Sequence, residues 1–262
     1  MEPLLRAEHV TISYNGKDVV RDVCFTLDQG EILGIVGESG SGKSTIIKAV
    51  IGLLGPGGMV TRGDIYYKGK NVVDMPEREQ RKLPGPEIGM VFQDCKASLC
   101  PIRTVGAQIY ESISEHERIS KSEAYQRVGE LMMKIGLTDY QRVLDSYPFE
   151  LSGGMNQRVG ICAAMMMKPA LLLADEPTSA LDVTVQAQVV KEMKLMRDEY
   201  NTAMILVTHN IGVVSVMADK VLVLKDGEMM DYGETEHVLK NSGNEYTRVL
   251  MNSVLHLKRH TA

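Results

Sequence analysis

Residues 37–44 have the sequence Gly37-Glu38-Ser39-Gly40-Ser41-Gly42-Lys43-Ser44. The glycines allow a tight turn in which consecutive backbone N–H groups face an anion. In such a loop the lysine reaches the β- and γ-phosphates of a nucleotide, and the serine after it can ligate Mg²⁺. This chemistry requires a strand before the loop and a helix after it. The sequence predicts both, a strand over Glu31–Val36 and a helix over Ser44–Leu54 that Gly55-Pro56-Gly57-Gly58 ends.

Short apolar runs alternate with helix-forming stretches along the rest of the chain, which predicts an α/β fold. The first two runs, Leu4–Ser13 and Val19–Leu27, flank the turn signal Asn15-Gly16 and predict an N-terminal antiparallel β-subdomain. The later runs favour a mainly parallel core sheet that is covered on both faces. After a hairpin at Asp226-Gly227 the chain is expected to close with two helices. These later elements are strands at Ile65–Tyr67, Ile88–Phe92, Leu171–Ala174, Met204–Val207 and Val221–Leu224, and helices at Glu234–Lys240 and Glu245–His256.

Between Asp94 and Leu151 the pattern becomes helical. Ser120-Lys121-Ser122-Glu123 is a capping box, which marks a helix N-terminus. The apolar residues that follow it recur at helical spacing and predict one buried face: Ala124, Val128, Leu131, Met132 and Ile135. We assign residues 1–262 to one P-loop NTPase-like domain. Residues 1–94 and 159–262 form its core, β-subdomain and closing helices, and residues 95–158 form an inserted helical subdomain.

Composition limits the partners that this chain can have. The net charge of −5 gives no basic footprint, so no nucleic-acid partner is expected. No apolar run reaches the ~18 residues of a membrane span, and no secretory signal is visible, so we expect a cytoplasmic protein. The chain has four cysteines, Cys24, Cys95, Cys100 and Cys162, without zinc-ribbon or CxxC spacing. They are expected to be reduced thiols, although Cys95 and Cys100 could form a redox or metal pair.

Two later stretches carry a related chemistry. Leu151-Ser152-Gly153-Gly154 places two glycines where backbone N–H groups can meet a phosphate at a helix N-terminus. Leu171–Glu176 is an apolar run that ends in two carboxylates, which a parallel strand would place at the sheet edge where Mg²⁺ and nucleotide bind. Two solvated acids at a strand end are the alternative interpretation. The phosphate loop followed by these two stretches resembles the nucleotide-binding subunit of ATP-binding-cassette (ABC) transporters.

This resemblance covers essentially the whole chain and implies an ATPase that uses ATP and Mg²⁺. Asp175 is expected to hold Mg²⁺ through water, and Glu176 to orient or deprotonate the attacking water. Gln93 matches the glutamine that contacts Mg²⁺ or water and hinges toward a membrane subunit. His209 matches the histidine that touches the γ-phosphate, although Asn210 replaces the Asp that is common after it. The implied catalytic residues are Gln93, Glu176 and His209, and the implied Mg²⁺ ligands are Ser44, Gln93 and Asp175.

Other residues are implied to bind the nucleotide or to connect two ATPase subunits. Leu151–Gly154 matches the signature that completes the ATP site of a second subunit. Asp182, in Ser179-Ala180-Leu181-Asp182, matches the D-loop aspartate that couples the two sites. Tyr14 lies where the family places an aromatic that stacks on adenine, and a plain turn tyrosine remains the alternative. The implied nucleotide contacts are Tyr14, Gly37, Ser39, Gly40, Ser41, Gly42, Lys43, Ser44, Thr45, Ser152, Gly153, Gly154 and Asp182.

Two stretches, Tyr147–Arg158 and Glu176–Gln188, resemble the peptide, nickel and opine importer branch of the family. Met155, where most ABC ATPases have Gln, is typical of one of the two ATPase subunits of that branch and is similar to the nickel and dipeptide first-ATPase type, as in the nickel import ATP-binding protein. Cys95 and Cys100 depart from the branch, because they replace its usual Pro and Asn. These positions lie near the expected contact with a membrane subunit, so the role of both cysteines stays open.

The implied assembly is an ABC importer. This chain would pair head-to-tail with a second ATPase subunit, and the branch resemblance favours a different chain over a second copy. The pair would lie beneath two transmembrane permease subunits, peripheral to the cytoplasmic face of the membrane, with an extracytoplasmic substrate-binding protein acting indirectly. Nickel, a metal–metallophore complex and di- or oligopeptides remain alternative cargoes. No iron–sulfur cluster is expected, because no cysteine follows Cys162, and His256 and His260 are expected to be solvated rather than metal-bound.

Other classes of function fit the sequence less well. A soluble ABC ATPase of DNA repair would need a long coiled coil, for which the interval Gln93–Leu151 is too short, and members that act in translation carry two ATPase domains. A non-enzymatic nucleotide sensor would lack one of Asp175, Glu176 and His209, all of which are present. An exporter ATPase subunit stays open, although exporters more often fuse this domain to membrane helices.

Overall fold

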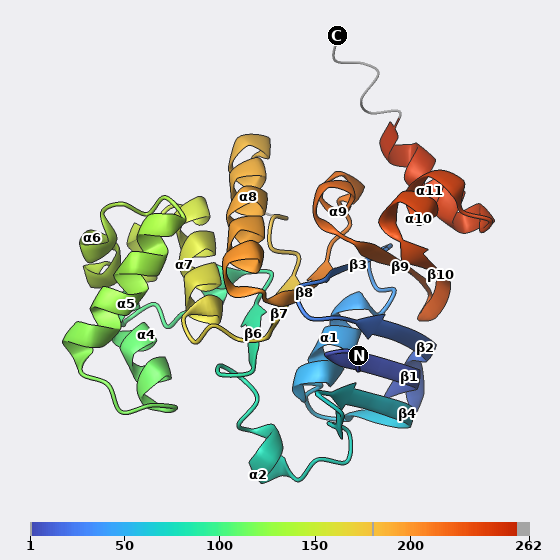
Figure 1. Cartoon of the computed structure of the whole chain (residues 1–262), viewed down its shortest axis with the longest axis horizontal. Helices are drawn as coiled ribbons and strands as arrows, with labels where there is room; N and C mark the ends of the chain where they lie inside the picture. Colours follow the sequence, from blue (N-terminus) through green and yellow to red (C-terminus); the bar gives the residue numbers. More distant parts are fainter. Residues whose placement is uncertain (1, 180, 256–262) are drawn as a thin grey trace. The chain divides into compact units, whose positions relative to one another are not determined.

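The computed structural model describes residues 2–179 and 181–255, which fall into two compact units (Figure 1). Unit 1 comprises residues 2–81 and 203–255, and unit 2 comprises residues 82–202 without residue 180. Unit 1 therefore holds the phosphate loop, whereas unit 2 holds the Leu151–Gly154 and Leu171–Glu176 stretches. Across the described part of the chain, no helix combines the length and apolar character that crossing a membrane requires.

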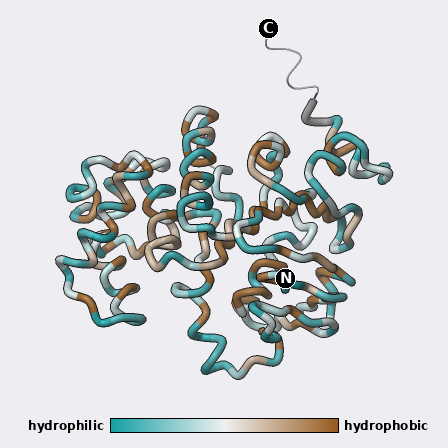
Figure 2. The backbone as a smooth tube through the Cα atoms, in the orientation of Figure 1, coloured by the Kyte–Doolittle hydropathy of each residue, from teal (hydrophilic) through white to brown (hydrophobic). Residues whose placement is uncertain are grey.

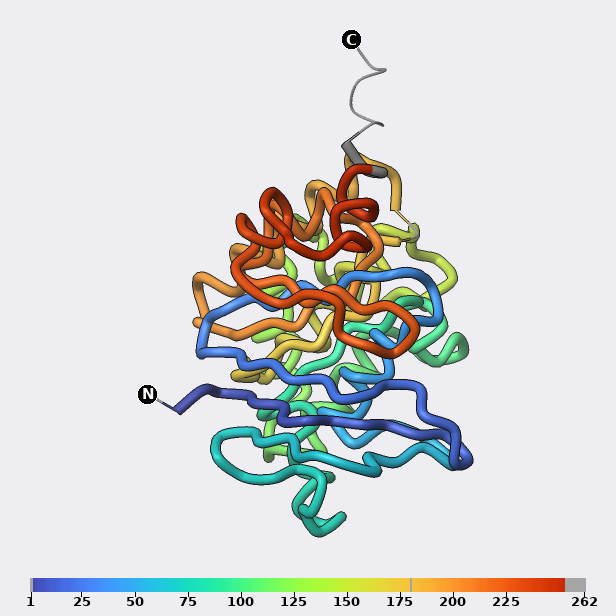
Figure 3. The backbone as a smooth tube through the Cα atoms, turned by 90° about the vertical axis from the view of Figure 1, so that its right-hand side faces the viewer, coloured from blue at the N-terminus to red at the C-terminus, as the bar shows by residue number. Residues whose placement is uncertain are grey.

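Unit 1 is built on a sheet in the order β5-β4-β1-β2-β10-β9-β3-β8. The β1, β2, β4 and β5 strands pair antiparallel, and Figure 3 shows β1 and β2 in blue, running beside each other. The β3 strand pairs parallel with both β8 and β9. The strands are β1 Leu5–Tyr14, β2 Lys17–Leu27, β3 Ile32–Gly37, β4 Gly58–Tyr67, β5 Lys70–Asn71, β8 Ala203–Val207, β9 Lys220–Lys225 and β10 Glu228–Glu234. The helices are α1 Lys43–Ile51, α2 Glu77–Gln80, α9 Ile211–Met217, α10 Thr235–Asn241 and α11 Glu245–Leu255.

The parallel strands of unit 1 lie in its core. Every residue of β3 and β8 is buried, as expected for strands covered on both faces. The trace along β9 is correspondingly brown, that is hydrophobic, in Figure 2. Helix residues Ile211, Val214 and Val238 pack in one buried cluster with Val36 and Val221 of the sheet. The α/β fold predicted from sequence, with an antiparallel N-terminal part and a mainly parallel core, is confirmed.

Two predicted elements of unit 1 had wrong limits. The first helix ends at Ile51 rather than Leu54, because Gly52 takes the left-handed conformation with φ 76°. Its N–H and that of Leu53 then bond back to the carbonyls of Ala49 and Lys48, at 3.2 and 2.7 Å, in a Schellman motif. The strand expected at Ile65–Tyr67 begins at Gly58. Its first half, residues 58–62, is partly exposed and holds only two apolar residues, so it forms no apolar run in the sequence.

Unit 2 contains a two-stranded parallel sheet of β6 and β7 and a group of helices. The capping box predicted at Ser120 is present, and the apolar face predicted for the following helix is buried. The single-domain boundaries assigned from sequence stay a prediction. The strands are β6 Ile88–Val91 and β7 Leu171–Asp175. The helices are α3 Cys95–Ser98, α4 Val105–Ser114, α5 Lys121–Lys134, α6 Tyr140–Asp145, the 3₁₀ turn η1 Pro148–Glu150, α7 Gly153–Met165 and α8 Val183–Tyr200.

Replacing Ser120 with Ala is expected to destabilise the protein by about 1 kcal/mol. The Ser120 hydroxyl accepts a hydrogen bond from the Glu123 N–H at 3.3 Å, and the Glu123 carboxylate accepts one from the Ser120 N–H at 3.0 Å. Alanine removes the first of these bonds and leaves a helix N–H unpaired. Urea unfolding measures the change. Ser122→Ala, on the same helix, is the control, and equal effects of the two substitutions would contradict the assigned cap.

Candidate functional site

The loop after β3 has a shape that its glycines impose. Gly37 has φ 153°, and a Cβ atom there would lie 2.0 Å from the backbone oxygen of Leu224. Gly42, with φ 98°, would place a Cβ atom 2.8 Å from Val20. The Gly227 N–H, in the turn between β9 and β10, donates to the Ser41 carbonyl at 3.1 Å. The loop is therefore seated on the sheet through its glycines and is held by the β9–β10 hairpin.

The N-terminus of α1 fits an anion. Its N-cap residue is Gly42, so no side chain caps the helix, and no acidic residue stands in its first turn. No capping side chain therefore competes with an anion for the backbone N–H groups of the first turn. The Ser41 hydroxyl is buried without a hydrogen-bond partner among the described residues. A phosphate group of ATP would satisfy both kinds of donor.

Lys43 places a positive charge against this loop. Its side chain is only 7% exposed, and its ammonium group donates to the carbonyl oxygens of Gly37 at 2.9 Å and Glu38 at 2.7 Å. Ser44 and Thr45 follow it, half-buried, in the first turn of α1, while Ser39 is exposed in the loop. The predicted phosphate-binding residues therefore surround one helix N-terminus.

His209 lies at the same sheet edge as the phosphate loop. Ile35 of β3 is aligned with Val207 of β8 in a parallel ladder, so Gly37 and His209 each follow two residues further on. His209 is exposed, as a residue that reaches a ligand must be. Asn210 caps α9, and its side chain accepts from the N–H groups of Gly212 and Val213. Asn210 can replace the usual Asp at this position because asparagine caps a helix N-terminus about as well as aspartate does.

Tyr14 ends β1 immediately before the turn. Its hydroxyl donates to the Leu54 carbonyl at 2.8 Å. Gly58 lies against its ring, since a Cβ atom there would be 2.7 Å from the ring carbon Cε1. These contacts fix the ring by its edge and hydroxyl, as the turn-tyrosine interpretation requires. Stacking on adenine stays a prediction.

In unit 2 the acidic residues follow β7 at the sheet edge. Val91 of β6 is aligned with Ala174 of β7, so Gln93 comes level with Glu176, one residue beyond Asp175. The Asp175 side chain is buried, at 7% exposure, whereas Gln93 is exposed. Glu176 has φ 48°, a left-handed conformation that costs a non-glycine residue about 1–3 kcal/mol and is typical of functional sites. Unit 2 therefore brings Gln93, Asp175 and Glu176 together.

The signature stretch forms the start of α7. Ser152 is the N-cap, and its hydroxyl accepts from the Met155 N–H at 3.3 Å. Gly153 has open space where a side chain would stand. Asn156, buried inside the helix, donates its amide to the carbonyls of Pro148 and Leu151 at 2.9 and 3.1 Å. Asn156 thus fixes the loop that leads into the signature, a role that the sequence analysis did not assign to it.

The D-loop leads into α8, which lies against the signature helix. Asp182 is the N-cap of α8, where its carboxylate accepts from the N–H groups of Thr184 and Val185, each at 3.0 Å. A Cβ atom on Gly154 would be 2.9 Å from Val185, so the two helices approach closely at this point. Further along, Arg158 of α7 forms an ion pair with Glu192 of α8. Ala180 of the D-loop lies outside the described residues, as do His256 and His260 of the tail.

The four cysteines are free thiols, so Cys95 and Cys100 do not form a disulfide. Cys95 is buried against α7, where a Cβ atom on Gly160 would lie 2.4 Å from its sulfur. Burial, and to a lesser extent the nearby Asp94 carboxylate, raises the pKa of the Cys95 thiol to about 12. Burial also raises the pKa of Cys162. Cys95 therefore serves as a packing residue beside the signature helix.

Cys95 is expected to react with iodoacetamide at pH 8 on the order of 10³-fold more slowly than an ordinary thiol. Only the thiolate reacts, and a thiol with a pKa near 12 is almost entirely protonated at pH 8. Its rate should rise with pH toward 12, well above the range in which ordinary thiols level off. Peptide mapping after timed alkylation measures this rate. Urea-unfolded protein, in which Cys95 should react normally, is the control, and equal rates in folded and unfolded protein would contradict the burial.

Comparison with known proteins agrees with this geometry. Residues 20–179 match the family model described as ABC transporter. The oligopeptide transport ATP-binding protein OppD of Bacillus subtilis is 42% identical over 256 residues, covering 96% of this chain and 72% of the relative. The dipeptide transport ATP-binding protein DppD of Lactococcus lactis is 41% identical over 249 residues, covering 94% of this chain and 71% of the relative.

A solved structure is similar over most of the chain. The ATP-binding cassette MJ0796, in a dimeric post-hydrolysis state bound to ADP and Pi, matches with a TM-score of 0.78 and 29% identity, covering 88% of this chain and 98% of that chain. The sequence and structure comparisons both identify the ABC transporter family, which the order of the motifs resembles. The loop over Gly37–Ser44 is suited to the phosphates of the ATP that this family binds. The chain therefore belongs to the ABC transporter family, as an ATP-binding subunit that hydrolyses ATP to drive transport.

Proposed function

We propose that this chain is the ATPase subunit of an importer of dipeptides or oligopeptides. The observation that carries the proposal is its identity of 41–42% with dipeptide and oligopeptide transport ATP-binding proteins over at least 94% of its length. Nickel, or a metal–metallophore complex, is the second candidate cargo, because Met155 after the signature is similar to the nickel as well as to the dipeptide first-ATPase type. In either case the permease subunits and an extracytoplasmic binding protein would select the cargo.

Phosphoryl transfer requires mainly positioning and charge neutralisation from the protein. We assign phosphate binding to Lys43 and to the N–H groups at the start of α1. Ser44, Gln93 and Asp175 offer hydroxyl, amide and carboxylate oxygens, which is the donor set that Mg²⁺ prefers. Bound Mg²⁺ would neutralise charge on the phosphate oxygens.

Glu176 and His209 are assigned to the hydrolytic step. Glu176 would accept the proton of the attacking water, or orient that water, from its left-handed backbone position at the edge of the sheet. His209 would contact the γ-phosphate from the edge that it shares with the phosphate loop. Gln93 would contact the bound Mg²⁺ or the attacking water, and Tyr14 would stack on adenine.

The assembly that we propose is a head-to-tail pair of ATPases. Ser152, Gly153 and Gly154 would bind the ATP held by the partner ATPase, and Asp182 would couple the two sites. The dimeric state of the cassette described above supports this arrangement. The branch resemblance favours a different chain as the partner. The pair would lie peripherally at the cytoplasmic face of the membrane, in contact with two permease subunits.

Uptake by the reconstituted transporter tests the proposal. This chain is combined in proteoliposomes with a candidate second ATPase, two candidate permease subunits and a candidate binding protein. Labelled dipeptides, longer peptides and Ni²⁺ are offered separately, and Lys43→Ala serves as the inactive control. ATP-dependent accumulation of peptides is expected. Accumulation of Ni²⁺ alone would overturn the peptide cargo, and ATP hydrolysis without uptake of any cargo would overturn the importer.

A further inference from the structure

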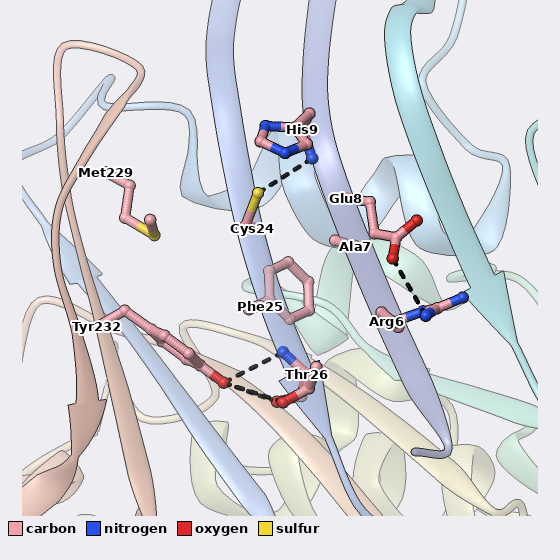
Figure 4. A pocket seen from close by; sticks show the side chains of 9 residues that line it. All are labelled: Arg6, Ala7, Glu8, His9, Cys24, Phe25, Thr26, Met229 and Tyr232. Carbon is pink, nitrogen blue, oxygen red and sulfur yellow. Dashed lines mark hydrogen bonds and ion pairs between the residues drawn. The ribbon is translucent and has the colours of Figure 1, made fainter. Parts of the chain in front are cut away.

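Three side chains that can ligate a metal converge on the β1–β2 ladder of unit 1. They are His9, Asp22 and Cys24, and their ligand atoms all lie within 4.8 Å of one another. The His9 Nδ1 atom is 2.7 Å from a carboxylate oxygen of Asp22. The backbone N–H of His9 donates to the Cys24 sulfur at 3.1 Å, as Figure 4 shows. The nucleotide site assigned above uses none of these residues.

Two β-bulges on neighbouring strands bring these side chains together. On β1, Glu8 and His9 together oppose Cys24, so His9 is the extra residue. At the second bulge, Arg21 and Asp22 of β2 together lie opposite Thr11 of β1, and Asp22 is the extra residue. The two extra residues have φ 50° and 51°, both left-handed. Bulges re-aim side chains, and here both aim a ligand group toward the same thiol.

The neighbouring strand and a side chain hold these bulges in place. Gly63 of β4 lies beside the first one, and a Cβ atom on Gly63 would be 2.3 Å from the carbonyl oxygens of both Glu8 and His9. The Asp22 N–H donates to the Thr11 hydroxyl at 3.2 Å beside the second one. Two strained non-glycine residues that face each other cost about 1–3 kcal/mol each, and such strain concentrates at ligand clamps. The convergence is therefore built into three strands.

The chemistry of the three groups selects a class of ion. An imidazole, a carboxylate and a thiolate form a mixed set of borderline and soft ligands, which suits Zn²⁺ and similar transition metals rather than Mg²⁺ or Ca²⁺. Three protein ligands leave the fourth tetrahedral position to water or another solute. We propose that His9, Asp22 and Cys24 bind one divalent transition-metal ion of the zinc class.

The surroundings allow an ion to enter and exchange. The His9 and Asp22 side chains are 78% and 75% exposed. Together with Phe25, Met229 and Tyr232, His9 and Cys24 line a hollow between β1, β2 and β10 (Figure 4). An exposed histidine–aspartate ion pair without metal affinity is the competing explanation. That explanation gives Cys24 no role. The contribution of Cys24 to metal binding therefore distinguishes a metal site from a plain ion pair.

Metal titration of the full chain tests the site. Co²⁺ is added in the presence of excess Mg²⁺, which occupies oxygen-ligand sites, and the thiolate-to-cobalt charge-transfer band is followed; Zn²⁺ then displaces the Co²⁺. One thiolate-ligated ion per chain is expected. His9→Ala and Asp22→Asn should each weaken binding at least about 10-fold, and Cys24→Ser, which removes the thiolate, should abolish the band. The matched controls His237→Ala and Cys100→Ser, at a histidine and a cysteine outside the cluster, should leave affinity unchanged.

A measurement on the unaltered chain covers the case in which a variant does not fold. Zn²⁺ should protect Cys24, but not Cys100, from alkylation by iodoacetamide. Absence of the cobalt band, or equal Zn²⁺ effects on Cys24 and Cys100, would overturn the site. The proposal does not depend on the peptide importer assignment, because neither readout involves ATP or transport.

Discussion

Glu176→Gln is expected to lower ATP turnover by about 10²- to 10⁴-fold while nucleotide binding is retained. Glutamine keeps the size and a carbonyl acceptor of the side chain, but it cannot take a proton from the attacking water. Glu176 follows a fully buried strand, next to Asp175, so the substitution changes one carboxylate and leaves the edge of the sheet in place. Phosphate release by the reconstituted transporter measures the effect.

The control is Glu130→Gln, an equally conservative change at an exposed position of α5 in the same unit. It should leave turnover within about twofold of the parent, in line with an ordinary surface substitution. Equilibrium binding of labelled ATP shows whether the Glu176 variant still binds nucleotide. Turnover by Glu176→Gln close to that of the control would remove Glu176 from the hydrolytic step, even if transport by the assembly were otherwise demonstrated.

The same variant separates hydrolysis from assembly. If ATP is enclosed between two ATPases, blocking its cleavage should accumulate the closed pair, because binding drives closure and hydrolysis reopens it. Light scattering of the two ATPase subunits without the permeases, at saturating ATP and Mg²⁺, should then report a larger species for Glu176→Gln than for the parent. A strictly monomeric chain that hydrolysed ATP at the rate of the intact assembly would exclude the shared site.

The parts of the fold that local rules determine could be predicted from the sequence. The strand–loop–helix around Lys43 follows from glycine spacing, and the capping box at Ser120 follows from the side chains of Ser120 and Glu123 alone. The turn at Asp226-Gly227 also forms as expected, with both residues at positive φ. In each case the residues that interact lie within a few positions of one another, so the sequence displays the whole interaction.

Features that depend on distant partners could not be predicted in this way. The bulges at His9 and Asp22 arise because neighbouring strands carry unequal numbers of residues, which no single strand reveals. Asn156 and Glu192 are polar residues inside helices, where the sequence alone would place them facing solvent. Their burial becomes favourable only because carbonyl oxygens and an arginine lie opposite them in the folded unit.

Glu192→Ala is expected to destabilise unit 2 by about 3–5 kcal/mol. The Glu192 side chain is only 3% exposed, and both its oxygens accept from the Arg158 guanidinium, each at 3.1 Å. Gln188 donates to it as well, at 3.0 Å. Alanine leaves the guanidinium of Arg158, 20% exposed, without its counter-charge. Urea unfolding followed by circular dichroism measures the loss.

A second substitution and a surface pair make this result specific. Replacing Arg158 and Glu192 together by Leu should recover most of the loss, because an apolar pair leaves no buried charge unpaired. Lys134→Ala breaks the ion pair of Lys134 with Glu199, whose side chains are 41% and 37% exposed, and should cost at most about 1 kcal/mol. Since Arg158 lies on the signature helix and Glu192 on the helix that Asp182 caps, the double variant should fold yet hydrolyse ATP more slowly. Full stability of Glu192→Ala would show that the pair does not hold these two helices together.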